Sequence, residues 1–273
     1  MPTLRHSVIL EPIPRRWLTE ALADLHALCE ELRSEKGVLH LEDEALPNVE
    51  HLEGRHLAPG SRYRITDEFG GGYGYGYGDG EDGAVADVVE MPEPDPVYVE
   101  IAHWSRTGPT RLRVAGGDEQ TSMDTELTLE SVHRPTRVAV SSAIRGVGSF
   151  ARYRTGELRA KADLDRWYAA RNSPAPVTAG FRHPLARGVV RLTMKQQKDG
   201  RWRVTFLTSF RGRSWARPLL AVGCVLFRSR LREGYRTGLD SMAESWNADV
   251  PTTVAKRPHN LRAELLAALR ERD

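Results

Sequence analysis

The sequence predicts an α+β fold in which antiparallel strands pack against one long helix near the C-terminus. Between 202 and 210, larger side chains alternate with mostly polar ones: Trp202, Val204, Phe206, Thr208 and Phe210. This period of two is typical of a strand with one buried face. From Ser214 to Trp246 apolar residues recur mostly every three or four positions, which predicts an amphipathic helix of about thirty residues. Because a short turn joins them, we expect the strand and the helix to bury each other.

The N-terminal half predicts one strand, one helix and then a series of short strands. The strand lies within 6–11 and ends at two prolines, and an apolar stripe predicts a helix over about 14–33. Glycine and proline then separate seven β-like segments: 38–41, 49–53, 61–69, 84–90, 97–104, 110–114 and 122–131. Short connections of this kind indicate an antiparallel meander.

Residues 70–83 read GGGYGYGYGDGEDG. Glycine at every second position removes the side chains that a strand needs and increases backbone freedom. One interpretation is a mobile hairpin tip; the other is a flap whose Tyr73, Tyr75 and Tyr77 cover a ligand. The segment matches neither a P-loop nor a dinucleotide-binding fingerprint.

The strand pattern breaks between about 134 and 187. Scattered apolar residues among arginine, alanine and lysine predict one or two helices there, the clearer over 157–170. Strands resume at 188–196, and a turn at 198–200 makes a hairpin with 202–210. We expect a linker at 249–258. A short helix over 261–270 follows, whose leucine stripe is suited to the body of the protein or to a second copy in a homodimer.

Composition narrows the functional classes. The 273 residues suffice for one large domain or two small ones, and a net charge of +2 argues against a nucleic-acid partner. Arginines crowd the C-terminal third, where they form either a solvated face or a basic rim for an anionic ligand or a membrane surface. Cys29 and Cys224 lie on apolar stripes, which is typical of a reduced protein. With no signal-peptide pattern or spanning run, we expect a soluble cytoplasmic protein.

Three passages, together with the order of the elements, resemble the START-like superfamily, also called SRPBCC, which includes polyketide cyclase/dehydrase-type proteins. The passages are EGRHLAPGSRYR at 53–64, TELTL at 125–129, and FRGRSWARPL at 210–219 followed by LDSMAESW at 239–246. The resemblance covers roughly 1–133 and 188–247. It implies a helix-grip fold, in which a curved antiparallel sheet surrounds the C-terminal helix above an apolar pocket. Residues 1–247 would then form one START-like domain with a helical insertion at about 134–187, and 248–273 a linker and a short helix.

Three functions follow from this reading, and the sequence leaves all of them open. The first is binding of a hydrophobic small molecule, such as a lipid, an isoprenoid or a polyketide, in the pocket between sheet and helix. The second is an enzyme of the polyketide cyclase/aromatase or dehydratase type. The third is a protein-interaction module whose interior is filled.

Candidate site residues lie on the strand faces that should point inward and, for Leu226, on the C-terminal helix. The expected ligand-binding residues are Tyr63, Ile65, Phe69, Val99, Ile101, Met123, Phe206 and Leu226. An aspartate and a histidine in an apolar cavity would have shifted pKa values, so Asp67 and His103 are candidates for catalytic acid and base. Without a catalytic role, Asp67 would simply end a strand near the hairpin, and His103 would be a residue on the rim before a turn. The histidines at 40, 51 and 56 lack paired metal-ligand spacing, so we expect no metal and no cofactor.

Overall fold

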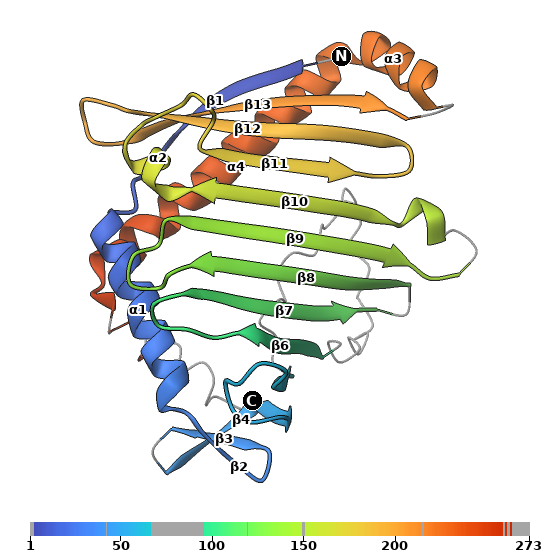
Figure 1. The fold of residues 1–273 in the computed structure, drawn as a ribbon. Coiled ribbons are helices and arrows are strands. Elements are labelled where there is room, and N and C mark those ends of the chain that lie inside the picture. Colours follow the sequence, from blue (N-terminus) through green and yellow to red (C-terminus); the bar gives the residue numbers. More distant parts are fainter. Residues whose placement is uncertain are drawn as a thin grey trace, which may run out of the picture.

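The computed structural model describes residues 3–41, 43–66, 96–118, 120–148, 151–213, 216–258, 260 and 263. Within them lies one antiparallel sheet of thirteen strands (Figure 1). The strands are β1 (Thr3–Leu10), β2 (Arg33–Glu35), β3 (Val38–Leu41), β4 (Glu44–Glu53), β5 (Arg62–Ile65), β6 (Val97–His103), β7 (Pro109–Gly117), β8 (Thr121–Glu130), β9 (Arg137–Gly146), β10 (Gly156–Asp163), β11 (Val177–Arg182), β12 (Ala186–Gln196) and β13 (Trp202–Gly212). The helices are α1 (Arg15–Glu31), α2 (Leu164–Tyr168), α3 (Ala216–Leu226) and α4 (Arg228–Ala255), with a 3₁₀ turn η1 (Ala151–Tyr153).

The sheet is a meander closed by the N-terminal strand. From β2 to β13 each strand pairs with the next, and β1 pairs with β13 at the far edge. The segment through α1 therefore connects the two edges of the sheet (Figure 1). Tight turns make the meander possible. At the β7–β8 turn, Gly117 has φ +149°, and an added Cβ would lie 2.2 Å from the Thr121 carbonyl oxygen.

The helix-grip fold with a helical insertion is wrong. Residues between about 134 and 187 form β9, β10 and β11 in the middle of the sheet, with only the short α2 between the last two. In β10 the apolar Leu158, Ala160 and Ala162 alternate with charged residues, which is the period of a strand. Alanine, leucine, lysine and glutamate favour helices in isolation, and pairing with β9 and β11 overrides that preference.

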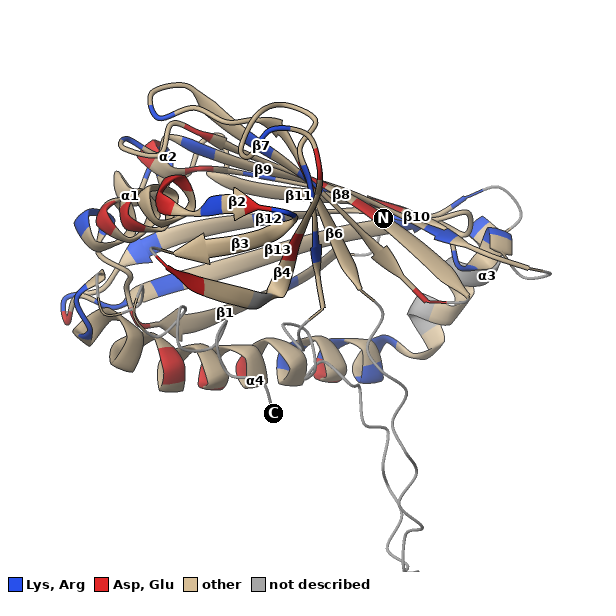
Figure 2. Cartoon of the chain, turned by 90° about the horizontal axis from the view of Figure 1, so that it is seen from below, with Lys and Arg blue, Asp and Glu red and all other residues tan. Residues whose placement is uncertain are grey.

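The C-terminal helix differs from the prediction at both ends. It is divided at Phe227, whose φ of −104° and ψ of 21° separate α3 from α4. Beyond Trp246 the helix α4 continues through Pro251 to Ala255, where a linker is predicted. The sheet does not grip α4; the helix crosses one face of it diagonally (Figure 1). Figure 2 shows the sheet as an arch over α4, with β7 and β9 farthest from the helix and β1 closest.

We call the face of the sheet that packs against α1 and α4 the inner face, and the opposite one the outer face. Two separate buried clusters lie on the inner face. The α4 core consists of Val8, Leu10, Met194, Trp202, Val204, Phe206 and Ala243. The α1 core consists of Leu28, Leu39, Leu41, Leu46, Tyr63 and Ile101. One row of paired residues connects them across β6 to β13: Ile101, Leu112, Leu127, Val140, Ala160, Ala179, Val190 and Thr208.

Polar side chains fasten α4 to the edge strand β1. His6 Nε2 and Asp240 Oδ1 lie 2.6 Å apart. The Asn247 side chain donates to the Ile9 carbonyl at 2.9 Å and accepts from the backbone N–H of Glu11 at 2.8 Å. The Asn247 amide thus substitutes for a neighbouring strand and satisfies backbone groups that an edge strand leaves unpaired.

Candidate functional site

Between the two cores, the inner face is apolar but not buried. We call the inner-face apolar residues of β8 to β11 the apolar stripe: Met123, Leu127, Leu129, Val138, Val140, Ile144, Leu158, Ala160, Ala162, Val177, Ala179 and Phe181. No residue of these four strands is fully buried. Met123, Ile144 and Leu158 are 38%, 43% and 44% exposed. The two cores on the same face contain residues with 0–9% exposure.

The size and chemistry of the apolar stripe suit an elongated hydrophobic surface. Four strands spaced about 4.8 Å apart give a width of roughly 15 Å, and the length along the strands is about 20 Å. The two polar side chains within it bond to each other, because the Thr125 hydroxyl donates to Ser142 Oγ at 2.9 Å. The stripe therefore offers a continuous contact surface for an apolar molecule.

The structure distributes the predicted ligand-binding residues over several regions. Tyr63 and Ile101 belong to the α1 core, with Val99 packed against it, and Phe206 belongs to the α4 core. Ile65 is half-buried in β5, and Leu226 is 70% exposed on α3. Met123 alone of the predicted set lies in the apolar stripe. Phe69 lies outside the described residues.

The predicted acid–base pair gains no geometric support. Asp67 lies outside the described residues, as does the glycine-rich segment 70–83. His103 is exposed at the end of β6. A register irregularity after Ile101 pairs His103 with Arg111, so that it does not share the buried position of Ile101.

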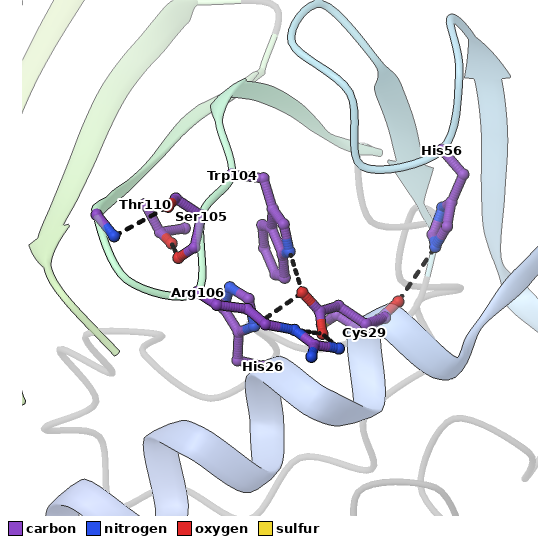
Figure 3. Close-up of polar contacts among 9 residues, drawn as sticks. His26, Cys29, His56, Trp104, Ser105, Arg106 and Thr110 are labelled. Carbon is purple, nitrogen blue, oxygen red and sulfur yellow. Dashed lines mark hydrogen bonds and ion pairs between the residues drawn. The ribbon is translucent and has the colours of Figure 1, made fainter. Parts of the chain in front are cut away.

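Histidine and tyrosine form a closed hydrogen-bond chain at the α1 core. His56 Nε2 lies 3.1 Å from the Cys29 carbonyl, which can only accept, so the imidazole proton is on Nε2 (Figure 3). His56 Nδ1 then accepts from the Tyr63 hydroxyl at 2.9 Å, and that oxygen accepts from the Leu57 N–H at 2.9 Å. Burial lowers the pKa of His56, in agreement with this neutral form.

A second polar group fastens α1 to the segment that follows β6. His26 stacks on Trp104 with ring centroids 4.1 Å apart, and Arg106 Nε donates to Glu30 at 2.6 Å (Figure 3). Burial lowers the pKa of His26, whereas the bond from Arg106 lowers the pKa of Glu30. Burial also raises the pKa of the Cys29 thiol to about 11. These groups stabilise the packing of α1, and no three metal-ligating side chains cluster among the described residues.

The sequence predicted which faces of the strands near the two edges of the sheet are buried, but it did not predict the apolar stripe between them. The signal was present in the alternation of Val138 and Val140 in β9 and of Leu158, Ala160 and Ala162 in β10. Because these segments were predicted to be helical, the alternation was not recognised as that of strands. None of the described helices combines the length and the apolar character that crossing a membrane requires.

Comparison with known proteins identifies no relative. No family model matches the chain, and neither a curated protein nor a solved structure matches it. These comparisons leave the resemblance to the START-like superfamily untested.

Proposed function

We propose that the protein binds an elongated hydrophobic molecule, of the lipid acyl-chain or isoprenoid class, on the apolar stripe. One observation supports this function. The stripe is apolar and only partly buried, with Met123, Ile144 and Leu158 exposed, although buried cores lie on either side of it on the same face. Contiguous apolar surface that is left partly exposed on a soluble protein often marks a site of interaction.

The hydrophobic effect favours a ligand that covers several strands at once. Each large aliphatic side chain that becomes fully buried contributes about 1.5–3 kcal/mol. Covering Met123, Ile144 and Leu158 together requires contact across three neighbouring strands, β8, β9 and β10. An extended chain satisfies this requirement better than a compact polar molecule.

A fluorescent probe displacement assay tests the proposal. The purified protein is titrated with the apolar probe N-phenyl-1-naphthylamine, which is then displaced by a long-chain fatty acid or by farnesol. In the double variant Ile144→Ser, Leu158→Ser we expect at least about tenfold weaker binding, because each substitution removes apolar contact area. Thermal melting checks that the variant remains folded.

Val189→Ser is the matched control. Val189 is 36% exposed on β12, where it pairs with Gly180 and Ser209 on the outer face. The substitution has the same chemistry but should leave probe affinity within about twofold of the wild type. The proposal is rejected if the wild type binds no probe, or if the outer-face and inner-face variants lose affinity equally. Copurification of an apolar protein segment on the stripe would instead favour an interaction module.

A further inference from the structure

Arginine side chains gather on the outer face near the ends of β10 to β13. Arg182, Arg187 and Arg211 lie side by side in one register row that begins at Glu157. Three adjoining hollows of about 400, 500 and 250 Å³ share residues of this row. The row is therefore part of a grooved surface.

The groove is strongly positive. Six arginines line its three hollows: Arg159, Arg182, Arg187, Arg211, Arg213 and Arg217. Among the described residues, Glu157 is the one acidic residue that lines them. Its carboxylate lies 3.9 Å from Arg159 and 4.0 Å from Arg182, distances that give weak pairing at an exposed site. The groove consequently has a large surplus of positive charge.

An exposed apolar helix face adjoins this groove. Val222 and Leu226, on α3, are 57% and 70% exposed, and Phe227, at the break between α3 and α4, is 53% exposed. The start of α3 rests directly on β13, because a Cβ added to Gly212 would lie 2.7 Å from the Arg217 Cα atom. Figure 2 shows α3 at the end of the sheet beside β10, among several lysine or arginine positions.

The first turns of α4 continue the positive charge. Arg228, Arg230 and Arg232 directly follow the apolar residues in the chain and are exposed. Apolar side chains on a helix, flanked by arginines, are the pattern of an element that lies in the boundary of a membrane. At about 16 Å, α3 is too short to cross the hydrocarbon layer, so it would lie in the membrane plane.

We propose that this corner of the protein docks on the surface of an anionic lipid bilayer. The corner consists of α3, the first turns of α4 and the arginine groove. Leu226 and Phe227 enter the headgroup–acyl boundary, and the arginines bind lipid phosphates and carboxylates. A nucleic acid would use the arginines and leave the apolar residues in water, so the combination favours a lipid surface. This inference uses other residues than the apolar stripe and stands independently of the proposed function.

Vesicle cosedimentation at 0.15 M salt tests the docking. The full chain is mixed with phosphatidylcholine vesicles containing about 30% phosphatidylserine, or none. We expect binding that requires phosphatidylserine. Arg213→Gln, Arg217→Gln, Arg228→Gln should weaken it roughly 100-fold, at roughly fivefold for each arginine. Val222→Ser, Leu226→Ser, Phe227→Ser should weaken it at least about tenfold.

A matched control removes the same charge elsewhere. Arg33, Arg55 and Arg111 are exposed near the α1 end of the sheet, and their triple change to glutamine should leave vesicle binding within about twofold. The inference is overturned if the wild-type protein does not bind anionic vesicles, or if this control loses as much binding as the triple variant of Arg213, Arg217 and Arg228. It is also overturned if the protein binds heparin but not the vesicles. Probe binding by the apolar stripe should survive both corner variants, so failure of one proposal is distinguishable from failure of the other.

Discussion

The α4 core and the apolar stripe lie on the same face of one sheet, yet only the core is buried. Both arise from alternating apolar residues, such as Val204 in β13 and Leu158 in β10. Val204 is 0% exposed, whereas Leu158 is 44% exposed. The two cores are buried because a helix packs on each of them. α4 packs on β1, β12 and β13, and α1 packs on the opposite edge of the sheet. An apolar pattern thus specifies a face, and its burial depends on a second element.

The largest expected effect comes from truncating one residue in each region. Trp202 is 8% exposed and meets Trp167 edge-on, with ring centroids 5.6 Å apart. Trp202→Ala should lower the free energy of unfolding by about 3–5 kcal/mol because it leaves a cavity. Leu158→Ala should cost less than about 1 kcal/mol. Urea denaturation measures both, and equal losses would show that the stripe is as well packed as the core.

Removing the hydrogen bonds that attach α4 to β1 should loosen the helix that covers the α4 core. Asn247→Leu deletes the bonds to Ile9 in β1 and to Glu11 just after it, so the backbone C=O of Ile9 and N–H of Glu11 lose their partner. We expect a loss of about 2 kcal/mol in urea denaturation, from two hydrogen bonds of about 1 kcal/mol each. Glu244→Gln, at an exposed position of the same helix, is the control and should change stability by less than about 0.5 kcal/mol. An unchanged stability in Asn247→Leu would assign the attachment of α4 to apolar packing alone.

How much the sequence revealed depended on residue type. Trp202, Val204 and Phe206 are aromatic or β-branched, and both their strand and its burial were predicted. Glu157 to Ala162 alternates just as regularly, but its good helix formers concealed a strand that is defined by its neighbours. The break at Phe227 and the continuation of α4 past Pro251 were not predicted either, because the apolar spacing runs on through Phe227 and proline usually ends a helix. The apolar stripe could not be recognised because three of its four strands, β9 to β11, fall in the segment that was predicted to be a helical insertion.

Beside the α1 core lie one buried and one half-buried histidine, His26 and His56. Burial lowers the pKa of both His26 and His56, so the unfolded chain takes up protons more readily than the folded one. The neutral histidines therefore leave stability unaffected above the unfolded pKa of about 6.5, and the free energy of unfolding decreases as the pH falls below that value. The melting temperature should therefore drop between pH 7.5 and 5.5.

Substitution identifies the histidines responsible. The drop should become smaller in His56→Gln and in His26→Gln, because the folded chain then no longer excludes those protons. His103→Gln changes an exposed histidine and should leave the pH dependence as it is in the wild type. Identical pH profiles for all three variants would mean that the α1 core tolerates imidazolium.

The remaining prediction concerns the reactivity of the Cys29 thiol, which reports whether α1 stays packed on its end of the sheet. Burial raises its pKa from 9.0 to about 11, so at pH 8 the thiolate fraction is about 100-fold lower than in the unfolded chain. In a Cys224→Ser background, iodoacetamide should therefore modify native Cys29 at least about 100-fold more slowly than the urea-unfolded chain. A native rate within about tenfold of the unfolded rate would mean that α1 leaves the sheet readily. The protein would then have one permanently closed core, and the stripe would extend towards β6.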